Sequence, residues 1–429
     1  MHLKINCYVL FLINFLYSVH SASILALFST LSYADQLVYR GYVELLAHRG
    51  HHIVVMTPYP GLLKYPEVEK IVELDVSHDS TPFYEEYKKI HANVEDYFAD
   101  LRKVKELAIK VAVAQMRSQQ MTAVFINPNV QFDLVITEAD MPILYAVAEK
   151  YRCPHIAITA SIGTLNMFES KGTPNNPMLY NDANTLRHGQ INIIHKIEEY
   201  QRYWRFKYEY YYYFLPLCQL AAEKIFKMKR DLLEVEEDID MLLVTGNHVL
   251  LGNRPIPPAV VYVDNLHIKP DVVLPQELPE STLQMIMDAF GELDYNVVFK
   301  IGNETAVRIP KNVHTQLCGC DCHFIFLNIY FRYKDAMIEL RYLTMDSVLT
   351  GPDRAIWNTE YVLRHGGAKH LRSALIGINL VQFLMLDFFG NLLIVLLFIV
   401  APFYYLIKFI CNRFRSRSKK DSKGKFKAL

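Results

Sequence analysis

Short apolar runs alternate with helical patterns along the first part of the chain. Residues 23–28 form an apolar run, and after a polar turn apolar positions recur at helical spacing over residues 37–49. Gly50 stands where a helix C-terminus favours glycine, and residues 52–56 form the next apolar run. The pattern predicts a βαβ unit, and ligands of such sheets bind in the loops that follow the strands.

The same alternation continues through the middle of the chain. Residues 132–137, 155–159 and 241–245 are apolar runs of strand length, and residues 142–151 have a helical pattern. Strands that alternate with helices favour a doubly wound, mainly parallel sheet. We therefore predict an α/β fold.

An unusually aromatic segment interrupts this alternation at residues 200–215, which read YQRYWRFKYEYYYYFL. A helix buried against the core explains such a composition. A lid over an acceptor pocket and a helix lying on a bilayer surface explain it as well. The sequence leaves these three interpretations open.

The pattern becomes sparse beyond a proline-rich connection at residues 253–258 (NRPIPP), which marks a domain boundary. After it, only residues 296–301 have a clear strand pattern, and helical patterns cover about 281–290 and 333–349. A Rossmann-like domain needs more strands to form a sheet with both faces covered. The second domain is therefore predicted to be truncated.

A long apolar segment lies near the C-terminus, where residues 388–407 carry no charge. Twenty helical residues span roughly 30 Å, the thickness of the hydrocarbon core of a bilayer. Residues 408–429 are rich in lysine and arginine and contain Asp421 as their one acid. Although a buried core helix is the alternative, the basic flank favours a transmembrane helix followed by a cytoplasmic tail.

Residues 1–22 resemble a secretory signal peptide, with an apolar stretch followed by small residues. Residues 23–387 are then expected in a lumen. Lys425 and Lys427 match a dilysine-type retrieval signal, although chance in a lysine-rich tail also produces this spacing. We expect a single-pass type I protein of the endoplasmic reticulum membrane.

Charge and cysteine content narrow the function further. The 45 basic and 45 acidic residues cancel, which argues against nucleic acid as a partner. Cys318, Cys320, Cys322 and His323 are spaced too closely for a usual structural zinc site, so no metal is expected. Asn303 begins an N-glycosylation sequon, NET, which is usable in a lumen.

Several segments together resemble a known family. The strand–loop–helix opening, the acidic strand end, the tyrosine-rich helix, the interdomain crossing and the block before the apolar segment all contribute. They are residues 23–60, 132–139, 208–214, 253–270 and 350–373. This combination is similar to the animal, insect-type UDP-glycosyltransferases and UDP-glucuronosyltransferases, and to the baculoviral ecdysteroid UDP-glucosyltransferases.

The resemblance implies a GT-B-like architecture of two Rossmann-like domains. Residues 23–252 would bind the acceptor, residues 253–349 would be the truncated donor domain, and residues 350–387 would return to the first domain. The implied reaction transfers a hexosyl group from UDP-glucose or UDP-glucuronate to a hydroxyl group of a small lipophilic acceptor. No further cofactor is implied, and the implied partners are the membrane and related transferases in a homo- or hetero-oligomer.

The implied catalytic pair departs from the family pattern. Asp35 stands at the position of the family's general base, a histidine, and Glu138 stands at that of the carboxylate that orients it. A carboxylate with a pKa near 4 is a weak base unless an apolar cleft raises that pKa. The alternative role of Asp35 is the N-cap of the following helix.

The donor-binding segments of the family have no counterpart here, so the donor-binding residues stay unassigned. The phosphate loop is missing before residue 279, and the family's His-Gly-Gly signature is missing before residue 332. His365, Gly366 and Gly367 belong to a different family segment and are not expected to bind phosphate. The alternative function is therefore that of a catalytically impaired splice form or incomplete gene product, acting as a lipophile-binding or regulatory partner.

Overall fold

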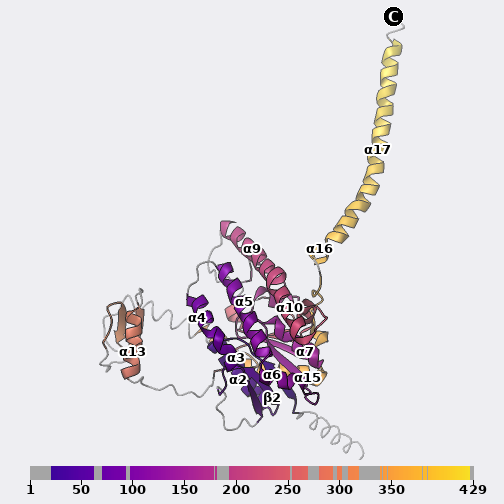
Figure 1. The fold of residues 1–429 in the computed structure, drawn as a ribbon. Helices are drawn as coiled ribbons and strands as arrows, with labels where there is room; N and C mark the ends of the chain where they lie inside the picture. The colour runs from indigo at the N-terminus through magenta and orange to yellow at the C-terminus, as the bar shows by residue number, and fades with distance from the viewer. Residues whose placement is uncertain are drawn as a thin grey trace, which may run out of the picture.

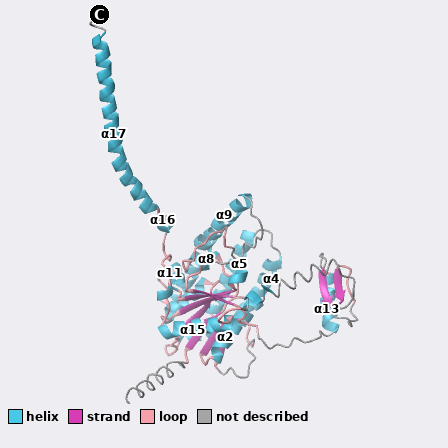
Figure 2. Cartoon of the chain, turned by 180° about the vertical axis from the view of Figure 1, so that it is seen from behind, coloured by secondary structure: helices cyan, strands magenta, loops and turns pink. Residues whose placement is uncertain are grey.

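Seven apolar strands form one parallel sheet in the order β3-β2-β1-β4-β5-β6-β7. They are β1 (Ser23–Leu27), β2 (His52–Thr57), β3 (Ile71–Asp75), β4 (Leu134–Glu138), β5 (His155–Thr159), β6 (Met241–Thr245) and β7 (Val260–Val263). In this computed structural model of the chain, helices cover both faces of the sheet (Figures 1 and 2). The structure describes residues 21–61, 70–92, 97–177, 179–180, 193–251, 254–268, 280–292, 297–301, 308–317, 339–340, 342–344, 346–378, 380–383 and 385–425.

Side chains of β1 alternate between two hydrophobic cores, one on each face of the sheet. Leu25 and Leu27 belong to the core that three helices cover, α5 (Tyr97–Met116), α7 (Tyr145–Tyr151) and α10 (Leu215–Phe226). Ile24 and Ala26 belong to the core under α2 (Tyr33–His48) and α15 (Gly351–His365). Strands buried on both faces read as continuous apolar runs, which explains why their pattern is visible in the sequence.

The helices around this sheet are mostly short. They are α2 (Tyr33–His48), α3 (Ser77–Ser80), α4 (Tyr84–Ala92), α5 (Tyr97–Met116), α6 (Gln119–Ile126), α7 (Tyr145–Tyr151), α8 (Leu165–Glu169), α9 (Ile193–Tyr208), α10 (Leu215–Phe226), α11 (Leu232–Asp238), α12 (His248–Leu251) and α15 (Gly351–His365). Three 3₁₀ turns, η1 (Thr81–Phe83), η2 (Pro142–Leu144) and η4 (Lys369–Leu371), and a π-helical stretch, η3 (Glu209–Phe214), complete this set.

The predicted α/β class is confirmed by this sheet and its helices. The strands expected at residues 155–159 and 241–245 have the predicted bounds. The sequence did not reveal β3 or the long helix α5. Residues 253–349 were assigned to the second domain, whereas β7 pairs in parallel with β6 as the last strand of the first sheet.

The described part of the second domain contains β8 (Val297–Ile301) and β9 (Val313–Leu317), which pair in parallel, and α13 (Glu280–Gly291). Figure 2 shows this small unit with its two strands beside α13. Asn303 and the cysteine-rich residues 318–323 lie outside the described residues.

The connection after β7 packs tightly between two helices. Asn265 adopts a left-handed backbone with φ of 56°, which asparagine tolerates better than most residues. A methyl group at Gly41 of α2 would overlap the backbone of Leu266, and one at Gly351 of α15 would overlap Asp264. The Tyr42 and Thr359 hydroxyl oxygens, 2.6 Å apart, also join α2 to α15. This close packing holds α15 on the first domain.

The C-terminal apolar segment is helical. After α16 (Leu380–Phe383), α17 (Leu386–Lys425) contains a candidate membrane span at Leu386–Ile410. The span has a mean hydropathy of 2.4, and the rest of the protein does not bury it. This span includes the predicted residues 388–407. Figure 1 shows α17 projecting away from the sheet domain.

We expect Gly351→Ala to lower the free energy of unfolding by about 1–3 kcal/mol, because the added methyl group forces α15 away from Asp264. Chemical denaturation of the full chain in detergent micelles measures this loss. Arg364→Ala is the control, since its exposed pair with Glu360 contributes little. Equal stability of the Gly351→Ala variant and the native chain would show that the helix does not depend on this close approach.

Candidate functional site

Glu138 lies at the carboxyl end of β4 and fixes the loop that follows β1. Its Oε2 accepts hydrogen bonds from the Ser29 backbone N–H at 2.9 Å, the Ser29 hydroxyl at 3.1 Å and the Thr30 backbone N–H at 3.0 Å. The two strands are neighbours in the sheet, with Leu27 opposite Thr137. Glu138 therefore fixes the N–H groups of the β1–α2 loop, while the side-chain amides of Gln36 and Gln115 bind carbonyl groups of the same segment.

The pKa of Glu138 is raised to about 8, mainly by burial and then by the nearby charges of Asp140 and Asp35, while the hydrogen bonds from the loop N–H groups oppose the shift. The side chain is only 6% exposed. Loss of solvation disfavours the charged form of a carboxyl group, and so do like charges. Glu138 therefore holds a proton over most of the neutral range, and its role here is to position the loop.

Asp35 lies in the first turn of α2, at the end of the loop that Glu138 holds. Burial raises its pKa, the charge of Asp140 adds to this, and the hydroxyl groups of Ser32 and Thr30 oppose it. The N-cap interpretation of Asp35 is wrong, because Ser32 is the N-cap and its Oγ accepts a hydrogen bond from the Asp35 N–H at 3.4 Å. The raised pKa makes Asp35 a stronger base than a solvated carboxylate.

Asp140 is a third acid at this edge, which the sequence analysis missed. The Thr159 hydroxyl, from the end of β5, donates a hydrogen bond to Asp140 Oδ2 at 2.9 Å. Tyr39 lies near these acids. Burial is the main cause that raises the pKa of Tyr39, and the charges of Glu138, Asp140 and Asp35 raise it further. The signal that was available was the position of Asp140 two residues after Glu138, at the same strand end.

The structure thus brings the two predicted residues to one edge of the sheet but gives them different surroundings. Asp35 is half-buried in a helical turn, whereas the Glu138 oxygen that would orient a neighbouring base binds loop N–H groups instead. A half-buried carboxylate with a raised pKa can take a proton from an alcohol positioned beside it.

Two other predictions concern metals and phosphate. Among the residues that the structure describes, no group of three or more His, Cys, Asp or Glu side chains is arranged to hold a metal ion. Gly366 has φ of 62° and ends α15, and a methyl group at Gly367 would contact Asp240. These two glycines therefore have a structural role, consistent with the expectation that this His-Gly-Gly sequence is not a phosphate loop.

A family model described as "UDP-glucoronosyl and UDP-glucosyl transferase" matches residues 24–302 and 329–421. The match leaves out residues 303–328, which include the cysteine-rich segment. It covers the sheet domain, α15 and most of α17.

Individual relatives agree with this match. The ecdysteroid UDP-glucosyltransferase of Lymantria dispar multicapsid nuclear polyhedrosis virus is 23% identical over 335 residues, covering 70% of this chain and 66% of the viral protein. UDP-glucosyltransferase 2 of Dactylopius coccus is 22% identical and covers 92% of this chain and 93% of the insect protein. That alignment extends over 497 positions, more than the 429 residues present here, so the insect protein has segments without a counterpart in this chain. Among solved structures, the calicheamicin glycosyltransferase CalG4 is 17% identical over 69% of this chain and 70% of its own, with a TM-score of 0.34.

The raised pKa of Glu138 makes the stability of the fold depend on pH. The folded state binds a proton between the ordinary pKa of 4.5 and the folded pKa of about 8, and the unfolded state does not. The free energy of unfolding should therefore fall as pH rises through this window, by at most about 1.4 kcal/mol per pH unit.

Glu138→Gln removes the ionisable group and keeps an oxygen for the loop N–H groups, so its unfolding should depend less steeply on pH. Denaturation of both proteins at a series of pH values measures the two slopes. Identical slopes for the native chain and the variant would contradict the assignment of the proton to Glu138.

Proposed function

Because the chain belongs to the UDP-glucuronosyl and UDP-glucosyl transferase family, we propose that it transfers a hexosyl group from a UDP-sugar to a hydroxyl group of a small lipophilic acceptor. The viral and insect relatives named above as UDP-glucosyltransferases support UDP-glucose as the donor to test first. UDP-glucuronate is the second donor to test.

The observation that carries the mechanism is the position of Asp35. It lies in the first turn of α2, directly after the β1–α2 loop, and its pKa is raised by burial. In open α/β sheets ligands bind at this end of the strands. An acceptor bound next to this turn presents its hydroxyl group to the Asp35 carboxylate.

The reaction balances with Asp35 as general base. Asp35 takes the proton of the acceptor hydroxyl while the hydroxyl oxygen forms a bond to the anomeric carbon of the sugar. The bond from that carbon to the diphosphate oxygen breaks, and UDP leaves with the bonding electron pair. Attack on the face opposite the leaving group inverts the anomeric configuration. Burial and the negative charge of Asp140 raise the pKa of Asp35, which favours uptake of the proton by Asp35.

We also propose that the chain is a single-pass type I protein of the endoplasmic reticulum. The candidate span in α17 and the basic residues after it support a membrane anchor with a cytoplasmic tail. The sheet domain and Asn303 would then lie in the lumen, where Asn303 is open to glycosylation.

One observation favours a second candidate function, that of a non-catalytic binding partner. The family match is interrupted at residues 303–328, and the longer insect relative has segments without a counterpart here. The acceptor half could then bind lipophiles or regulate a related transferase. Titration calorimetry of the full chain with UDP separates the two functions, since the transferase must bind UDP and the partner need not.

We expect Asp35→Asn to lower kcat/KM for transfer from UDP-glucose to a lipophilic alcohol by about 10²–10⁴-fold, because the amide cannot accept the proton. His48→Ala, at the exposed far end of the same helix, is the matched control and should leave the rate unchanged. Product formation measured by chromatography provides the rate, and UDP affinity should be equal in all three proteins. Full activity of the Asp35→Asn variant would eliminate Asp35 as the base.

A further inference from the structure

An exposed apolar stripe runs along α9 and continues into η3. Its members recur every three or four residues, so they share one side of the helix. They are Ile193, Ile197, Tyr200, Trp204, Tyr208 and Tyr212, which we call the α9 stripe. Their exposed fractions lie between 45% and 76%, and the neighbouring Ile194 is also exposed. The interpretation of this aromatic helix as buried against the core is therefore wrong for this side of α9.

The other side of α9 is fixed to the sheet domain. Phe206 is buried with Phe98 and Leu165, and the Arg205 guanidinium lies over the Phe98 ring at 4.2 Å. Lys207 forms a 3.0 Å ion pair with Glu169. The helix is therefore held in one orientation, and its apolar stripe faces outward because of that packing.

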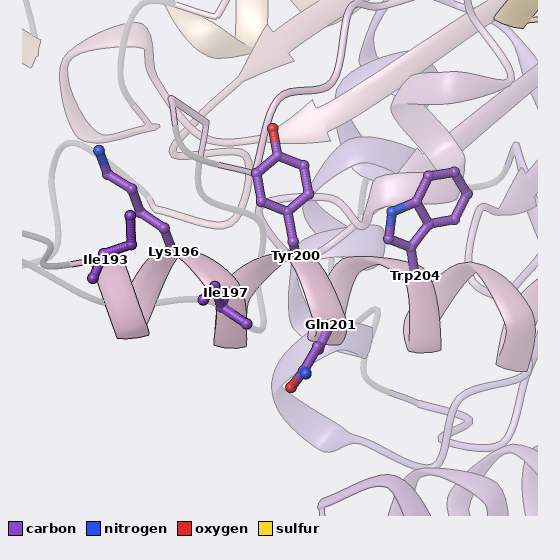
Figure 3. Close-up of a pocket in the computed structure, with 6 residues that line it drawn as sticks. All are labelled: Ile193, Lys196, Ile197, Tyr200, Gln201 and Trp204. Carbon is purple, nitrogen blue, oxygen red and sulfur yellow. The ribbon is translucent and has the colours of Figure 1, made fainter.

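The chemistry of the stripe suits the boundary between lipid and water. Tyrosine and tryptophan are enriched at that boundary, and an interfacial helix combines such residues with lysine and arginine on its polar side. Figure 3 shows Lys196, Tyr200 and Trp204 on the same side of α9. Together with Ile193, Ile197 and Gln201 they line an open hollow of about 540 Å³. Lys196 can pair with a lipid phosphate while the rings and isoleucines enter the acyl region.

The arrangement of the chain brings this surface toward the proposed anchor. In Figures 1 and 2, the N-terminal end of α9 protrudes from the sheet domain and reaches the level at which α16 leads into α17. The candidate span begins at the first residue of α17. A bilayer crossed by α17 would therefore also meet the protruding end of α9.

We propose that the α9 stripe lies in the lipid–water interface of the bilayer that α17 spans, with Lys196 at the level of the phosphate groups. This inference rests on the membrane anchor proposed above. The sheet domain would then have two contacts with the membrane, so that its acceptor half stays beside the lipid phase in which lipophilic compounds concentrate.

The chain contains two tryptophans, Trp204 in the stripe and Trp357 on α15, and this allows a direct test. Both are about half exposed, and Trp357 stacks on Tyr361 at 5.4 Å. Both views place α15 in the half of the sheet domain farther from α17. Trp357→Phe leaves Trp204 as the single reporter, and Trp204→Phe leaves Trp357 as its matched control.

The full-length variants are reconstituted, one copy per nanodisc, in phosphatidylcholine with phosphatidylserine, with or without bromine on the acyl chains. Brominated lipid quenches only a tryptophan that contacts it. We expect the emission of Trp204 to fall to roughly half or less in brominated discs, as for an interfacial aromatic side chain, and that of Trp357 to stay unchanged. Lys196→Glu, added to the Trp204 reporter, should reduce the quenching because its charge repels phosphatidylserine.

Equal Trp204 emission in both kinds of disc would overturn the proposal. If Trp204 is protected from quenching by brominated lipid only in discs that hold two copies, the stripe binds a second copy of the chain instead. If the protein does not enter nanodiscs at all, the anchor is wrong as well. UDP binding by the same samples is measured separately, so failure of this inference is distinguishable from failure of the proposed transferase function.

Discussion

A buried carboxyl oxygen joins two strand ends at the candidate site. Glu138 Oε2 accepts the N–H groups of Ser29 and Thr30, and thereby ties the end of β4 to the loop that leads from β1 into α2. Asp35 belongs to the first turn after that loop, so this contact, together with the Ser32 N-cap, helps to position it. The surroundings that make Glu138 a protonated anchor also raise the pKa of Asp35, which links the fold of the loop to the proposed chemistry.

This contact changes how the departure from the family pattern is interpreted. The sequence suggests two carboxylates in place of an imidazole and its orienting carboxylate. In the structure the hydrogen-bond partners of the two acids differ. Glu138 accepts the Ser29 and Thr30 N–H groups and the Ser29 hydroxyl, whereas Asp35 interacts with the hydroxyls of Ser32 and Thr30. Asp140, fixed by Thr159, supplies the nearby charge instead.

The sequence predicts best the strands that are buried on both faces of the sheet. The strands β5 and β6 are buried on both faces and read as unbroken apolar runs, so their bounds were found. The edge strand β3 was missed because Val72 is exposed and Glu73 interrupts its apolar pattern. The partners of Glu138 could not be found either, since its contacts with Ser29 and Thr30 join residues more than a hundred positions apart. The strand ends bring both acids to one edge, but only packing assigns their roles.

The central claim, that Glu138 carries a proton at neutral pH while Asp35 is free to accept one, is tested most directly by difference infrared spectroscopy. A protonated carboxyl group absorbs apart from a carboxylate, and Glu138→Gln identifies the signal of this residue. The account predicts a protonated-carboxyl band at neutral pH in the native chain that is absent from the variant and disappears above pH of about 8. Identical spectra of the two proteins in that region at neutral pH would show that Glu138 is ionised and would contradict the account.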